Sequence, residues 1–229
     1  MIIRRIFIVL FLLIFLSIIL REFIIKEYIS YKFSKWAERE VKIEKLIFKF
    51  PNQFIIKNIV IFNKNPNFYK KNFSSENINI DIDVKSYLFS DLVIINSLSI
   101  ENSNFFLEIV KNSKNKNNQK GKDEIIYMDN IGLAEKNFLK KEPKVWPIKK
   151  KDVNFLIKKT YLSNTNASIY IPSIPIETKI TLSNFQFSNV GNDLKAKHYK
   201  DVFKILLLDT FASVKIMKIK SLLKTIYNF

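Results

Sequence analysis

Residues 77–84 read NINIDIDV and alternate apolar and polar side chains without a fault. Successive side chains of a β-strand point to opposite faces, so this period of two predicts a half-buried strand. The residues expected on its apolar face are Ile78, Ile80, Ile82 and Val84. Asp81 and Asp83 fall on the polar face, where a solvated surface explains them better than a catalytic pair, because no partner His, Lys or ligand cluster is visible.

Similar signals on both sides of this stretch predict a β-rich domain over residues 41–197. The apolar positions of residues 41–50 change parity, with Val41 and Ile43 on one face and Leu46 and Phe48 on the other. The other strands are expected at residues 54–62, 92–100, 105–110, 153–162, 167–171 and 179–187. The expected fold class is therefore mainly β.

The N-terminus predicts a membrane anchor. Residues 6–20 read IFIVLFLLIFLSIIL, a run that spans roughly 22 Å as a helix against a hydrocarbon core of about 30 Å. Arg4, Arg5 and Arg21 can extend their guanidinium groups into the headgroups and lengthen the usable span. The residues chosen to mark the anchor are Ile6, Leu10, Leu13, Leu16 and Leu20.

A cleaved secretory signal is the alternative for this run, but cleavage needs small residues after it. Arg21, Glu22 and Phe23 stand there instead, so an uncleaved anchor is favoured. Arg4 and Arg5 place the N-terminus in the cytoplasm. The rest of the chain would then be exported, to the periplasm in a Gram-negative cell. Residues 23–40 continue as a helix, giving an anchor unit over residues 1–40.

Two further segments complete the expected organisation. Residues 111–124, KNSKNKNNQKGKDE, are polar and of low complexity, which predicts a disordered loop. From His198 the apolar residues recur every three or four positions, which predicts a C-terminal amphipathic helix over residues 198–229. That helix either covers the sheet with its apolar face or touches an anionic bilayer with its lysines.

Composition excludes several kinds of chemistry. The chain has no Cys, one His and three Gly in 229 residues. Thiol catalysis, Cys-based metal sites and glycine-rich phosphate loops therefore have no basis, and no HExxH or GxSxG motif occurs. We expect no enzymatic activity, no cofactor and no metal. The net charge of +17 indicates either an anionic partner or the codon bias of an AT-rich genome. Because the chain is expected to be anchored and exported, nucleic acid is not an expected partner.

The order of these features resembles the N-terminal part of AsmA-like proteins. These are inner-membrane-anchored periplasmic proteins related to TamB and to eukaryotic bridge-like lipid transporters. The likeness is carried by the anchor, by VKIEKLIFKF and FIIKNIVIFN, and by ENINIDIDVKSYLFSDLVIINSLSIENSNFFLEI. It implies an antiparallel sheet curled into a groove, apolar inside, that shelters acyl chains. The chain is much shorter than most members of that family.

Three functions follow from this reasoning. The first is a lipid-binding or lipid-transfer protein of the inner membrane, whose partner is phospholipid or another acyl lipid in envelope or outer-membrane biogenesis. The second is a membrane-anchored adaptor similar to LptC-type subunits of lipopolysaccharide export, which binds a protein partner by strand addition. The third is a structural protein without a ligand. The residues expected to line the groove are Phe48, Val60, Ile78, Ile80, Ile82 and Val84.

Overall fold

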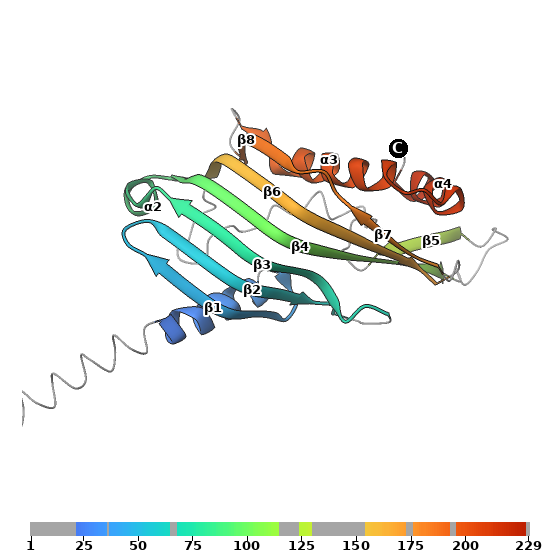
Figure 1. Cartoon of the computed structure of the whole chain (residues 1–229), viewed down its shortest axis with the longest axis horizontal. Helices are drawn as coiled ribbons and strands as arrows, with labels where there is room; N and C mark the ends of the chain where they lie inside the picture. Colours follow the sequence, from blue (N-terminus) through green and yellow to red (C-terminus); the bar gives the residue numbers. More distant parts are fainter. Residues whose placement is uncertain are drawn as a thin grey trace, which may run out of the picture.

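The computed structural model describes residues 22–35, 37–64, 68–114, 124–129, 154–172, 176–192 and 196–227. The described chain is mainly β, as expected: nine strands join in one hydrogen-bonded sheet (Figure 1). The strands are β1 (Val41–Lys49), β2 (Gln53–Phe62), β3 (Lys71–Ile82), β4 (Leu92–Lys114), β5 (Glu124–Asp129), β6 (Asn154–Ile171), β7 (Ile176–Thr181), β8 (Phe185–Gly191) and β9 (Lys197–His198). The described helices are one over residues 22–35, α2 (Val84–Phe89), α3 (Tyr199–Ala212) and α4 (Met217–Tyr227).

The sheet is mixed rather than antiparallel, which corrects the expectation from the family resemblance. Strands β1 to β4 form an antiparallel meander, but β6 pairs with β4 in parallel from Leu92↔Asn154 to Glu108↔Tyr170. β8 and β9 are also parallel. A parallel pair needs a long crossover between its strands, and residues 115–153 provide it. Strand order beyond β4 therefore depended on long-range pairing, which hydrophobic alternation does not report.

A polar row crosses the sheet and changes the backbone conformation of three of its strands. We call Glu44, Asn58, Glu76, Asn102 and Asn164 the asparagine row; they occupy matching register positions on β1, β2, β3, β4 and β6. The asparagines at 58, 102 and 164 have φ of 51°, 50° and 49°, the left-handed region that Asn tolerates better than other side chains with a Cβ. All five residues are exposed.

Side-chain amides tie the asparagine row together. Asn58 Nδ2 donates to Glu44 Oε2 at 2.6 Å, and Asn102 Nδ2 donates to Glu76 Oε2 at 2.7 Å. Asn164 Nδ2 donates to Asn102 Oδ1. A neighbouring strand thus supports the left-handed conformation at each asparagine.

The asparagine row also shifts the alternation of side chains by one residue. In β2, Ile56 and Ile59 are both buried in the same core, although strict alternation would put residues three apart on opposite faces. In β1 the buried residues change from Ile43 to Leu46 in the same way. The same face of the sheet therefore carries buried apolar residues on both sides of the asparagine row, and we call it the inner face.

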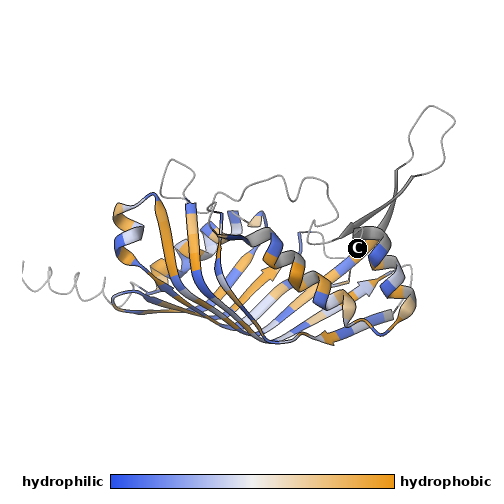
Figure 2. Cartoon of the chain, turned by 90° about the horizontal axis from the view of Figure 1, so that it is seen from above, coloured by the Kyte–Doolittle hydropathy of each residue, from blue (hydrophilic) through white to orange (hydrophobic). Residues whose placement is uncertain are grey.

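Helices cover both flanks of the inner face. The core of β1, β2 and β3 contacts Ile29 and Phe33 of the helix over residues 22–35, and Ala37 just after it. At the other flank, Val202 of α3 packs with Phe187 and Val190 of β8. In α4, Ile219 and Leu223 are fully buried against β4, β6 and β7. Seen from above, the sheet is a curved trough with these helices along its sides (Figure 2).

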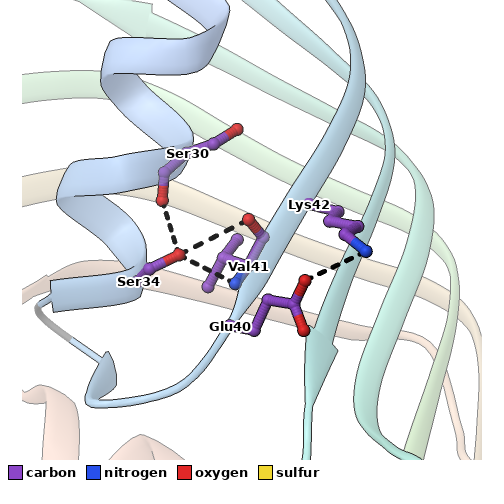
Figure 3. Close-up of polar contacts among 5 residues, drawn as sticks. All are labelled: Ser30, Ser34, Glu40, Val41 and Lys42. Atoms are coloured by element: carbon purple, nitrogen blue, oxygen red, sulfur yellow. Dashed lines mark hydrogen bonds and ion pairs between the residues drawn. The ribbon is translucent and has the colours of Figure 1, made fainter.

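The helix over residues 22–35 also closes part of the sheet edge. The backbone N–H of Val41, the first residue of edge strand β1, donates to Ser34 Oγ at 2.8 Å. Ser34 Oγ in turn donates to Ser30 O at 2.8 Å (Figure 3). An open edge strand invites pairing with other chains, so this helix protects the start of β1 as well as its inner face.

Three local expectations need correction. The C-terminal segment forms two helices rather than one, because residues 213–216 leave helical geometry between α3 and α4. The predicted loop over residues 111–124 begins later, since β4 continues to Lys114 by pairing with β5. The predicted strands at residues 92–100 and 105–110 are a single strand. Residues 115–123 of that loop and the anchor over residues 6–20 lie outside the described residues.

We expect Asn102→Ala to lower the free energy of unfolding by about 1–2 kcal/mol, because alanine has no side-chain amide to support a left-handed backbone. Asn102→Gly should cost less, since glycine adopts positive φ freely. Urea unfolding of the detergent-purified chain measures both. Asn104→Ala, on the same strand at an ordinary φ, is the control. Equal stability of Asn102→Ala and Asn104→Ala would contradict the role given to the asparagine row.

Candidate functional site

A row of large apolar side chains crosses the inner face beyond the asparagine row. Phe48, Phe54, Ile80 and Leu98 occupy matching positions on β1 to β4, and we call them the apolar row. The ring centroids of Phe48 and Phe54 are 4.9 Å apart. All four side chains are only partly buried, whereas Leu46, Ile56 and Ile78, one step nearer the asparagine row, are buried.

The apolar row lies between the two helical covers. Ile80 and Leu98 border the core beneath the helix over residues 22–35. The opposite cover, made by α3, contacts β6 and β8. The residues that α3 contacts are on β6 and β8, so its contacts do not extend to Phe48, Phe54, Ile80 or Leu98, and Figure 2 shows that the sheet itself is curved. The central inner face is therefore the best candidate for a ligand-binding surface in the described chain.

The structure brings together four of the six predicted groove residues. Phe48, Ile78, Ile80 and Ile82 share the inner face. Phe48 aligns with Ile80 through Phe54 of β2, and Ile78 and Ile82 are on the same face of β3 as Ile80 by alternation. Ile78 is 8% exposed, so protein already covers it. Phe54 and Leu98 were not predicted, although they align with Phe48 and Ile80. Their apolar character was visible in the sequence, but their alignment required the pairing register.

Val60 is on the wrong face. It pairs with Lys42 and Ser74, whose positions lie on the outer face, while its neighbours Ile59 and Ile61 contact the inner core. The left-handed conformation at Asn58 shifts the alternation of β2 by one residue and turns Val60 outward. The prediction for Val60 assumed unbroken alternation through Asn58 and is wrong for that reason.

Val84 is not in the strand at all. β3 ends at Ile82, and Asp83 caps α2 by accepting hydrogen bonds from Lys85 N and Ser86 N through its side chain. Aspartate is among the preferred N-cap residues because its short side chain reaches the first free N–H groups. Val84 is the first residue of α2 and is 37% exposed, so the predicted groove lining ends at Ile82.

The outer face holds one buried carboxylate. Glu108 is 2% exposed and accepts hydrogen bonds from Phe68 N at 3.1 Å and from Tyr69 N at 3.4 Å through Oε2. The ring of Phe68 stacks on that of Tyr170 with centroids 3.9 Å apart. Glu108 thus clasps the chain between β2 and β3 to the outer face. The sequence signal was an acid inside the apolar run NFFLEIV, which sequence reasoning passed over.

The neighbouring tyrosine is held in its neutral form. Burial, together with the hydrogen bond that Tyr69 Oη donates to Glu177 Oε1 at 3.0 Å, raises the pKa of Tyr69. A raised pKa makes this phenol a poor base or nucleophile. The Glu108 and Tyr69 cluster therefore has the character of a structural clasp rather than a catalytic pair.

The other candidate sites give weaker support for a function. Among the described residues no group of three or more His, Asp or Glu is placed to hold a metal ion. A cleft of about 520 Å³ lies between the end of the helix over residues 22–35, residues 38–40 and the end of β2. Its charged lining mixes Lys35, Arg39 and Lys64 with Glu38 and Glu40, so it favours neither sign strongly. His198 ends the sheet in β9.

The membrane anchor stays a prediction. No helix within the described residues is both long and apolar enough to cross a membrane. The anchor residues Ile6, Leu10, Leu13, Leu16 and Leu20 lie outside that part of the chain. Comparison with protein-family models, curated proteins and solved structures finds no match to this chain.

We expect Glu108→Ala to lower the free energy of unfolding by about 1–3 kcal/mol, because it leaves the buried N–H of Tyr69 and that of Phe68 without their acceptor. Urea unfolding measures the loss. Glu101→Ala is the matched control: Glu101 is on the same strand, and its partners are the side chains of Asn77 and Ser99. A loss no larger than that of the control would show that the clasp contributes nothing.

Proposed function

We propose that this protein is a membrane-anchored lipid-binding or lipid-transfer protein that holds acyl chains against the inner face of its curved sheet. The apolar row is the observation that carries the proposal. Four large apolar side chains lie side by side and partly exposed on the inner face of the curved sheet, across β1 to β4. Burial of such surface is favourable by roughly 25 cal/mol per Å², which a bound acyl chain supplies without a protein partner.

Two further features support a lipid occupant. Thr160 lies on the inner face in register with Leu98, and its buried Oγ1 has no hydrogen-bond partner among the described residues. A buried hydroxyl of this kind can donate to an ester carbonyl or phosphate oxygen. The apolar run over residues 6–20 would hold the trough beside a bilayer, a source of acyl lipid. Localisation to the inner membrane, with the described domain in the periplasm, belongs to this proposal.

The resemblance to AsmA-like proteins points the same way. Apart from the anchor, the segments that carry the resemblance form β1 to β4, the strands that bear the apolar row. Because the chain is short, movement of lipid across an envelope would need a longer partner or several copies end to end. Action at the inner membrane alone needs neither.

An adaptor function is the second candidate, and the free edge of β1 favours it. In the described sheet β1 pairs with β2 alone, so one edge of β1 has no partner strand. On that edge, Ser34 accepts the hydrogen bond of Val41 N. The remaining edge could take up a strand of a partner protein. Such an adaptor would be a subunit of a lipid or lipopolysaccharide export assembly. A lipid-free sheet that binds a partner would favour this function over the first.

We expect Ile80→Asp to reduce the phospholipid retained per protein by about tenfold or more, because a carboxylate on the inner face must be desolvated when an acyl chain covers it. Native mass spectrometry and lipid extraction of the detergent-purified full chain measure retention. The control is Asn79→Asp, which adds the same charge to the next residue of β3, on the opposite face.

Circular dichroism establishes that each variant is folded. Ile80→Trp offers a second readout, since it reduces the room on the inner face without adding charge, and it should also lower retention. The proposal fails if folded Ile80→Asp keeps as much phospholipid as the wild-type chain. It fails equally if the folded wild-type chain retains no phospholipid.

A further inference from the structure

Exposed aromatic side chains gather at one end of the trough. Phe50 is 88% exposed in the turn between β1 and β2, and Phe89 is 86% exposed at the end of α2. Beside Phe89, Leu88 is 57% exposed. Large apolar side chains that stand out this far from a folded domain mark a contact with another apolar phase when they cluster.

The two tips are neighbours in the fold. Asn52 Nδ2 donates to Asp81 Oδ1 at 2.8 Å, and Ile82 N donates to Asn52 O at 2.9 Å. These bonds fix the β1–β2 turn beside the end of β3, from which the Asp83 cap leads directly into α2. Figure 1 places the turn, α2 and the start of the helix over residues 22–35 at the same end of the sheet.

The start of that helix adds to the apolar end. Phe23 and Ile24 are each 58% exposed, and the chain before them carries the apolar run over residues 6–20. Lys49, next to Phe50, and Lys85, in the first turn of α2, are exposed cations at this end. Asp91 and Glu22, the residue before Phe23, are exposed acids nearby. Aromatic rings with adjacent lysines are typical of segments that lie in the headgroup region of an anionic bilayer.

We infer that this end of the trough is a membrane-docking surface. Phe50, Leu88 and Phe89 insert into the same bilayer that holds the N-terminal anchor, while Lys49 and Lys85 contact anionic headgroups. The anchor, the β1–β2 turn and α2 then all contact the bilayer. These three contacts fix the orientation of the domain with one end of its sheet at the membrane.

End-on docking gives the lipid a route, a consequence that rests on the proposed function. The apolar row and Ile82 lie towards the docked end, because β1 reaches Phe48 just before the Phe50 turn and β3 reaches Ile82 just before α2. An acyl chain leaving the bilayer there meets apolar side chains without crossing water.

Site-specific labelling tests the docking surface in the full chain. The sequence has no Cys, so Phe50→Cys and Phe89→Cys each accept a single environment-sensitive fluorophore. The labelled chains are reconstituted into vesicles of phosphatidylcholine and phosphatidylglycerol that contain lipids with a quencher on the acyl chain. Both probes should be quenched by these lipids and protected from a water-soluble quencher.

The control label is at Met217, which is 84% exposed at the start of α4, a helix at the opposite end of the sheet (Figure 1). A probe at Met217→Cys should respond only to the water-soluble quencher. The inference is overturned if the Phe50 and Phe89 probes behave like the Met217 probe, whether all three are in water or all three are in lipid.

A paired variant separates docking from lipid holding. Phe50→Ser combined with Phe89→Ser should slow the uptake of fluorescent phospholipid from vesicles by roughly tenfold, while lipid already bound stays bound, since the apolar row is intact. Unchanged uptake would overturn the role in lipid access. Docking and lipid retention are measured separately. If Ile80→Asp loses bound lipid while the probe at position 50 is still quenched by the lipid-borne quencher, docking is established and only lipid retention has failed.

Discussion

The left-handed backbone at Asn58, Asn102 and Asn164 decides which side chains this sheet can bury. Strict alternation would turn every apolar residue beyond the asparagine row outward. Because three strands share the same conformation at the same register position, apolar residues on both sides of the row are on the same face of the sheet. The carboxylates of Glu44 and Glu76 hold two of the amides in place. Without this row the core under the N-terminal helix and the apolar row could not belong to one face.

The curved sheet needs covers at its flanks, and the chain supplies one from each end. The N-terminal helix protects both the inner face and the first edge position through Ser34. The C-terminal helices bury Ile219 and Leu223 completely. Between them the middle strands keep partly exposed apolar side chains in register. A protein that only needed stability would gain from filling this space, because exposed apolar surface adds nothing to folding. In the proposed function a bound acyl chain covers this surface.

The sequence predicted the parts of the fold that depend on neighbours along the chain. The alternation around Ile80 identified β3 and its buried face. The parity change between Ile43 and Leu46 was also visible in the sequence, but the asparagine row that accounts for it was recognised only in the structure. Val60 and Val84 failed for local reasons: Asn in the left-handed region and Asp as a helix cap interrupt a strand pattern that otherwise looks continuous. The parallel pairing of β4 with β6 and the alignment of Phe54 with Ile80 could not be predicted, because both depend on contacts between distant segments.

The parallel pairing of β4 and β6 also orders the assembly of the molecule in time. Strands β1 to β4 each pair with the strand made just before them, and local pairings of this kind form quickly. β6 can pair with β4 only after residues 115–153 have been synthesised. Until then, the edge of β4 that later binds β6 lacks that partner. A chaperone or a second copy that meets the growing chain would find its unpaired backbone there, at what later becomes the centre of the sheet.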